Sequence, residues 1–176
     1  KWSVLPSKLR SKPTDQEMTV ASTTATSTPG HLGRNLFTAH MTALAPTQPV
    51  ICGLSMGGAV ALELLLNGTL RLAGGILVGT GARLRVHPGI FETLERDFEA
   101  YVNGLAALGA SPATDPRRLA GVEAAARSCG PQVTAMDFRA CDRFDVMERV
   151  GEIRLPVLVV TGTDDRLTPA KYGDYL

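Results

Sequence analysis

Three short apolar runs along the chain show no alternation with polar residues. They cover residues 49–54, 75–78 and 155–161, with proline or glycine at or next to their ends. Strands inside a parallel sheet are covered on both faces, and they therefore show continuous apolar sequence. We predict three buried strands here, the first of them buried on both faces.

The apolar residues between these runs recur at helical spacing. Residues 57–66 are almost entirely apolar and end at Asn67-Gly68, which predicts a buried helix with a glycine C-cap. From Ile90 to Leu105, apolar residues three and four positions apart predict one amphipathic helix. Further helices are predicted over residues 36–44 and from Asp115-Pro116, Pro131, Asp145 and Pro169 onward.

The order of these elements defines the fold class. Buried strands that alternate with helices along a chain of 176 residues indicate one α/β domain with a parallel sheet. Residues 1–46 form a separate N-terminal segment, in which residues 1–30 are polar, include a Ser/Thr/Ala-rich stretch and show no clear period. We interpret them as a solvated or poorly ordered segment.

Composition excludes several classes of protein. Hydrophobic residues make up 44% and charged residues 20%, and the net charge is +1. These values predict a globular protein with no membrane span and no nucleic-acid partner. The three cysteines form no CxxC pair, which favours a reducing, cytoplasmic location. No residue spacing indicates a metal site or a cofactor. The glycines of Gly79-Thr80-Gly81 lack the third glycine of a dinucleotide loop.

A glycine-rich turn joins the first apolar run to its helix. Its sequence, GLSMGG at 53–58, places Ser55 between a predicted strand and a predicted helix. Small residues at Gly53 and Gly57 would let the strand and helix fold back on each other, and the turn would expose the Ser55 hydroxyl. The backbone N–H of Met56 would then point to the oxygen of an attacked carbonyl. This pattern predicts a nucleophile; the alternative is a capping serine in a glycine-rich turn.

A second polar group follows the third apolar run. The sequence Gly162 to Pro169 (GTDDRLTP) places carboxylates at the carboxyl end of that strand, the same sheet edge as Ser55. A buried carboxylate there would orient an imidazole and stabilise its protonated form. We interpret Asp165 as this acid and Asp164 as a turn residue. The alternative is that both aspartates make only turn and N-cap contacts.

These motifs together resemble the α/β-hydrolase family of serine esterases, lipases and lactonases. The resemblance rests on GLSMGGAVALELLL, GGILVGTGARLRVHP and LPVLVVTGTDDRLTP. It implies part of an α/β-hydrolase parallel sheet with helices on both faces, a core at 47–82 and 153–176, and a helical cap insert at 83–152. The position of Asp165 relative to Gly162 and Pro169 matches the family's acid.

The resemblance also implies a reaction. A serine hydrolase of this family would cleave a small or medium carboxylic ester, thioester or lactone through an acyl-enzyme, with no cofactor. Phenylalanines of the insert could shape the substrate pocket, although at helical spacing they are more often core residues; they are Phe91, Phe98, Phe138 and Phe144. Oligomeric state is not predicted.

The chain departs from the family in its histidines. All three, His31, His40 and His87, precede Asp165, whereas the family's base follows the acid, and no His-Gly oxyanion loop is found. We therefore expect the chain to be a fragment, cut at both ends, that is close to inert by itself. The alternative to an enzyme is a non-catalytic relic or a ligand-binding protein of the same fold.

Overall fold

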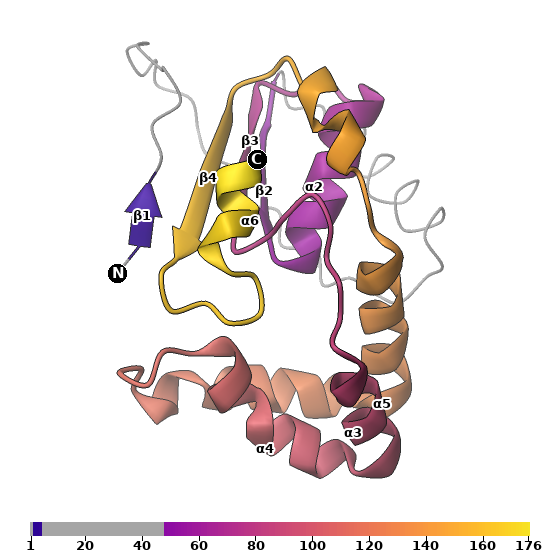
Figure 1. Cartoon of the computed structure of the whole chain (residues 1–176), viewed down its shortest axis with the longest axis vertical. Coiled ribbons are helices and arrows are strands. Elements are labelled where there is room, and N and C mark those ends of the chain that lie inside the picture. Colours follow the sequence, from indigo (N-terminus) through magenta and orange to yellow (C-terminus); the bar gives the residue numbers. More distant parts are fainter. Residues whose placement is uncertain (1, 5–47) are drawn as a thin grey trace.

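The computed structural model describes residues 2–4 and 48–176 (Figure 1). Its sheet has the strand order β1-β4-β3-β2, in which β2, β3 and β4 are parallel and β1 is antiparallel to β4. The three predicted apolar runs thus form the parallel strands, and the α/β fold class is confirmed. The strands are β1 (Trp2–Val4), β2 (Val50–Leu54), β3 (Gly74–Val78) and β4 (Val157–Gly162).

Two helices, α2 (Met56–Asn67) and α6 (Ala170–Tyr175), pack on one face of the sheet. Leu77 of β3 shares a buried cluster with Leu62 of α2. Leu77 pairs in register with Val159 of β4, so their side chains point to the same face, and Val159 lies against Gly173 of α6. No described helix covers the opposite face, so the helices predicted on both faces are found on one face of the described sheet, and those on the other face stay a prediction.

The prediction that the first strand is buried on both faces is wrong for the described structure. Val50 and Leu54 of β2 are 55% and 66% exposed, and Cys52 is also exposed. Ile51 and Gly53 point to the other face and are partly or fully buried beneath α2. The cause is the position of β2 at the end of the strand order, where no described element covers its second face.

Helix α2 is buried as its apolar sequence predicts. Leu62 and Leu64 are 0% and 2% exposed. Gly68 ends the helix with a φ of 59°, in the left-handed region that glycine adopts at low cost. The core clusters that α2 forms with the sheet also include Leu65, Leu72, Leu77, Ala82 and Val146.

A helical region, residues 88–143, lies beyond the carboxyl ends of the parallel strands (Figure 1). Its own buried cluster centres on Leu94, Tyr101 and Val102. The region consists of α3 (Pro88–Arg96), α4 (Phe98–Gly109), η1 (Pro116–Arg118) and α5 (Ala120–Arg143), and η2 (Met147–Glu152) follows it.

Two predicted helix boundaries in this region have different outcomes. The single helix predicted from Ile90 to Leu105 is wrong, because the chain breaks at Asp97, whose φ of −156° is extended. The Asp97 carboxylate accepts a hydrogen bond from Ala100 N at 2.9 Å, so it caps a new helix rather than continuing the old one. The helix start predicted at Pro131 is confirmed by the non-helical Gly130 before it.

The chain crosses between the sheet and the helical region twice, at residues 82–86 and 142–146, and these two segments run side by side. Val146 N donates to Ala82 O at 2.8 Å, and Val86 N donates to Asp142 Oδ1 at 3.0 Å. The division into a core and an insert at 83–152 stays a prediction. The predicted segment 1–46 lies outside the described residues apart from β1.

Residues 2–4 and 48–176 include no helix that combines the length and apolar character needed to cross a bilayer. Cys52, Cys129 and Cys141 are all free thiols. The cytoplasmic location predicted from them stays a prediction.

Candidate functional site

Ser55 occupies the turn between β2 and α2. Its φ of 51° and ψ of −117° make it the one non-glycine residue with positive φ among the described residues. An L-residue is strained in such a conformation, by about 1–3 kcal/mol, and keeps it only where its surroundings enforce it. The Ser55 residue is exposed at the carboxyl end of β2. The sequence prediction of a sharp strand-to-helix turn at this serine therefore agrees with the backbone.

The glycines around Ser55 have different steric roles. A Cβ at Gly53 would overlap the carbonyl group of Gly57, and a Cβ at Gly58 would lie 2.6 Å from Cβ of Thr80. The missing side chain at Gly53 lets β2 and α2 approach closely, and the missing side chain at Gly58 lets α2 lie against Thr80, just beyond β3. A Cβ at Gly57, in contrast, would meet no described atom within 4 Å. The prediction that Gly57 must be small for steric reasons is therefore wrong in this structure.

The end of β3 and the first turn of α2 hold the backbone of Ser55. Ser55 N donates to Val78 O at 2.9 Å. Ser55 O accepts from Thr80 Oγ1 at 2.8 Å and from Gly58 N at 2.9 Å. Met56 is the first residue of α2, where backbone N–H groups have no acceptor inside the helix and can bind a ligand oxygen.

Asp165 lies in the loop that follows β4. Its Oδ1 accepts hydrogen bonds from Leu167 N at 2.9 Å and Thr168 N at 2.8 Å. Its Oδ2 lies 2.8 Å from the Thr168 hydroxyl oxygen. Asp165 is half-buried, and these contacts fix the orientation of its carboxylate. The contacts with Leu167 N and Thr168 N are turn contacts of the kind that the sequence predicted for Asp164. In the structure Asp165 makes them.

Ser55 and Asp165 both lie next to the carboxyl end of strand β3. Val78, its last residue, accepts the Ser55 N–H, and Gly79 follows directly. Gly79 has a φ of 48°, and a Cβ on it would lie 3.3 Å from Asp165 Oδ2. The structure thus places Ser55 and Asp165 at the same edge of the sheet, on either side of the end of β3.

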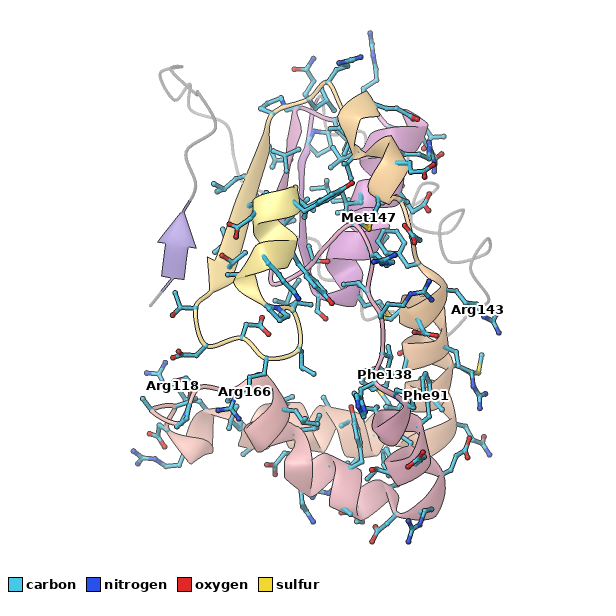
Figure 2. All side chains as sticks on the ribbon, viewed as in Figure 1. Phe91, Arg118, Phe138, Arg143, Met147 and Arg166 are labelled. Carbon is cyan, nitrogen blue, oxygen red and sulfur yellow. The ribbon has the colours of Figure 1, made fainter. Side chains whose placement is uncertain are left out.

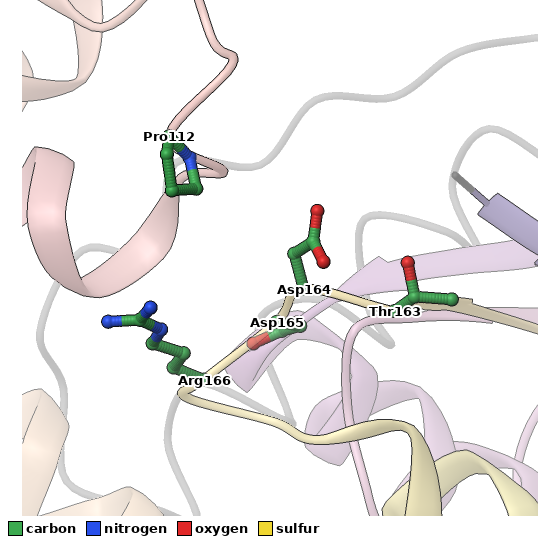
Figure 3. Close-up of a pocket in the computed structure, with 5 residues that line it drawn as sticks. All are labelled: Pro112, Thr163, Asp164, Asp165 and Arg166. Carbon is green, nitrogen blue, oxygen red and sulfur yellow. The ribbon is translucent and has the colours of Figure 1, made fainter.

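A hollow of about 430 Å³ lies between the Asp165 loop and the helical region. It is lined by Pro112, Thr163, Asp164, Asp165 and Arg166 (Figure 3). Ser111 Oγ, in the loop after α4, donates a hydrogen bond to Asp164 Oδ2 at 3.1 Å. The helical region therefore touches the loop that carries Asp165.

His87, the histidine within residues 48–176, serves as a helix cap. Its Nδ1 accepts a hydrogen bond from Gly89 N at 3.1 Å at the start of α3. This agrees with the expectation that His87 is not the base. His31 and His40 lie outside the described residues.

The phenylalanines considered for a substrate pocket are largely core residues. Phe98 stacks on Tyr101 with ring centroids 6.0 Å apart, and Phe138 meets Tyr101 edge-on at 5.9 Å. Figure 2 shows Phe91 and Phe138 within the helical region. Phe144 packs against the cluster around Leu62.

Sequence reasoning missed two threonines at this site, Thr80 and Thr168. Both are buried, at 2% and 7% exposure, and both hydroxyls contact a residue of the predicted pair. The signal for Thr80 was a hydroxyl residue just beyond a buried strand, and the signal for Thr168 was a hydroxyl residue in the loop that carries Asp165. As a sequence pattern, Gly79-Thr80-Gly81 indicates only an incomplete dinucleotide loop.

Comparisons with known proteins agree with this geometry. The sequence model described as the alpha/beta hydrolase family matches residues 20–176. A solved thermophilic esterase is 32% identical with a TM-score of 0.70, over 82% of this chain and 57% of the esterase. The enol-lactonase from Burkholderia xenovorans LB400 is 22% identical with a TM-score of 0.69, over 82% of this chain and 58% of the lactonase. The second likeness shows the fold alone.

This chain thus spans less than two thirds of the length of these solved structures. A comparison with curated proteins found no match.

Proposed function

Because the chain belongs to the alpha/beta hydrolase family, we propose that the protein is a serine hydrolase that transfers an acyl group to water through an acyl-enzyme on Ser55. One observation carries this proposal. Ser55 is held in a strained turn at the carboxyl end of β2, and Asp165 lies across the end of β3 from it. A strained, exposed serine and an oriented carboxylate on either side of one strand end, at the same edge of the sheet, fit the arrangement that a nucleophile and its acid require.

Each residue has a role in the proposed reaction. The Ser55 hydroxyl attacks the substrate carbonyl carbon, and its proton passes to a histidine. The Met56 N–H donates to the oxyanion that forms, which is worth about 10²–10³ in rate for one such donor. Asp165 orients the histidine and stabilises its protonated form. The histidine then protonates the leaving group, and water releases the acyl group from Ser55. No histidine among residues 48–176 is assigned this role.

The proposed substrate is a small or medium carboxylic ester, thioester or lactone. The thermophilic esterase at 32% identity supports an ester. The hollow beside Asp165 lies between the sheet edge and the helical region, where a substrate could enter. Among the described residues, no group of three or more His, Cys, Asp or Glu side chains is placed to hold a metal ion.

A fluorophosphonate probe tests the nucleophile, because it phosphonylates activated serines. We use "intact protein" for the full-length gene product of which we expect this chain to be a part. We expect the intact protein to be labelled at Ser55 and its Ser55→Ala variant to stay unlabelled. Ser128→Ala is the matched control, since Ser128 is on α5 and its hydroxyl donates to Ala125 O. Labelling of Ser55→Ala at the wild-type rate would overturn the assignment.

The second candidate is a ligand-binding protein without catalysis. The observation in its favour is that all three histidines precede Asp165. If the folded intact protein is not labelled at Ser55 and does not hydrolyse p-nitrophenyl acetate, this second function replaces the first.

A further inference from the structure

Thr80 contacts the nucleophile turn from a distance of 25 residues in sequence. Its Oγ1 donates to the carbonyl oxygen of Ser55 at 2.8 Å. We infer that Thr80 is a positioning residue that orients the oxyanion donor, the backbone N–H of Met56, through this hydrogen bond. The inference rests on the proposed function and adds to it a residue that the sequence motif does not contain.

The geometry of the peptide bond explains how Thr80 reaches the Met56 N–H. Ser55 C=O and Met56 N–H belong to the same planar peptide unit, in which the two groups point in opposite directions. No cis peptide bond is found in the described residues. A donor that fixes the direction of Ser55 O therefore also fixes the direction of the Met56 N–H. A small rotation of this unit would move the N–H away from the oxyanion.

The turn needs such a restraint because it is strained. Ser55 has a φ of 51°, and a strained residue relaxes unless its neighbours prevent it. Its N–H is held by Val78 O, and its carbonyl oxygen accepts from the Thr80 hydroxyl as well as from backbone N–H groups in the first turn of α2. The Ser55 residue is thus bonded at both ends to the segment that ends β3.

The Thr80 side chain has little freedom to move. It is 2% exposed. A Cβ at Gly58 would lie 2.5–2.6 Å from Cγ2, Cβ and Oγ1 of Thr80, so the first turn of α2 rests directly on this side chain. A hydrogen bond from a fixed, buried donor restrains its acceptor more than one from a mobile side chain, because less freedom remains in the pair.

Thr80→Val tests the inference, because valine has nearly the same shape and lacks the hydroxyl. Ser55 O keeps Gly58 N and Ala59 N as donors, at 2.9 and 3.3 Å, so no buried acceptor is left unpaired. We expect kcat of the intact protein with p-nitrophenyl acetate to fall about tenfold, part of the loss that follows removal of a whole oxyanion donor. KM should change less than twofold. The rate of labelling by the fluorophosphonate probe should fall by a similar factor.

Two further variants separate positioning from folding. Thr80→Ser retains the hydroxyl and should restore most of kcat. Thr161→Val changes a buried threonine of β4, 4% exposed, whose side chain lies against Gly173 of α6, and should leave kcat unchanged. Thermal unfolding of each variant is measured in parallel.

The outcomes are distinct. Wild-type kcat in Thr80→Val, with Ser55→Ala inactive, overturns the inference and leaves the proposed function intact. Failure of Thr80→Ser to restore kcat, or an equal loss in Thr161→Val, also overturns it, because the loss would then follow from packing. Full labelling of Ser55→Ala removes the proposed function and this inference with it.

Discussion

The hydroxyl oxygen of Thr168 lies 2.8 Å from Asp165 Oδ2, and the same oxygen lies 2.8 Å from Gly79 O. Thr168 therefore links the loop that carries Asp165 to the end of β3, the strand whose last carbonyl binds Ser55 N. A hydroxyl has one proton, so Thr168 donates to one of these two acceptors at a time. We therefore expect this buried contact to help set the spacing between Ser55 and Asp165 at the sheet edge.

Removing the Thr168 hydroxyl should destabilise the protein. Thr168→Val leaves the buried contact with Gly79 O and Asp165 Oδ2 without a donor, at a cost of about 1–3 kcal/mol. Thr168→Ser, which keeps the hydroxyl, should cost less than half as much. Urea unfolding of the three proteins measures this difference. Equal losses for valine and serine would show that the methyl group, and not the hydroxyl, matters.

The two glycines on either side of Ser55 should respond differently to alanine. Gly53→Ala places a Cβ on the carbonyl group of Gly57, so we expect a loss above about 2 kcal/mol in the free energy of unfolding or a failure to fold. Gly57→Ala meets no described atom and lies within α2, where alanine is better than glycine by about 1 kcal/mol. We therefore expect Gly57→Ala to be as stable as the wild type or more so. The same unfolding experiment measures both, and similar losses at the two positions would contradict the structure.

Leu62 should be among the most sensitive core positions. It is 0% exposed and packs between α2 and the sheet. Leu62→Ala should lower the free energy of unfolding by about 2–5 kcal/mol, through lost burial and the cavity that remains. Val122, 54% exposed on α5, is the control, and Val122→Ala should change stability by less than about 0.5 kcal/mol. A loss at Leu62 no larger than at Val122 would place the core elsewhere.

Stability should fall at high pH because of Tyr101. Burial raises the pKa of Tyr101 from 10.0 to about 12. Above pH 10 the unfolded phenol loses its proton while the native phenol keeps it, so the unfolded state binds fewer protons and stability declines as pH rises. This contribution is complete below pH 10 and is lost as pH rises toward about 12.

The Tyr101→Phe variant isolates this effect. The free energy of unfolding of the wild type minus that of the variant, measured by urea at pH 8 to 12, should become smaller or more negative as pH rises above 10. A difference that is constant with pH would mean that Tyr101 is not buried from solvent.

Cys141 should be the slowest thiol to alkylate. Burial, then the negative charge of Asp137, and more weakly that of Asp142, raises the pKa of the Cys141 thiol to about 11. At pH 8 roughly 0.1% of such a thiol is in the reactive thiolate form. Iodoacetamide labelling followed by mass spectrometry should therefore modify the exposed Cys129 well before Cys141. Modification of both at one rate would contradict the placement of Cys141.

Local patterns in the sequence were sufficient for the three parallel strands and for the sharp strand-to-helix turn at Ser55. Three apolar runs predicted β2, β3 and β4 because continuous apolar sequence has few stable environments outside a packed sheet. The GLSMGG turn and the GTDDRLTP loop indicated Ser55 and Asp165 because these motifs are short and lie directly after their strands. The helix C-cap at Gly68 and the start at Pro131 were predicted for the same reason: the residues that decide them are neighbours in the chain.

Contacts between distant parts of the chain decided the rest. The break at Asp97 depends on a side chain that binds the backbone in preference to continuing an amphipathic pattern. The burial of β2 depends on which elements lie beside it. Whether position 57 can carry a larger side chain depends on which atoms lie near its Cβ. Thr80 and Thr168 act on residues 25 and 89 positions away, Ser55 and Gly79. Sequence patterns report the preferences of neighbouring residues, whereas a buried hydrogen bond between strands exists only once packing has brought its two ends together.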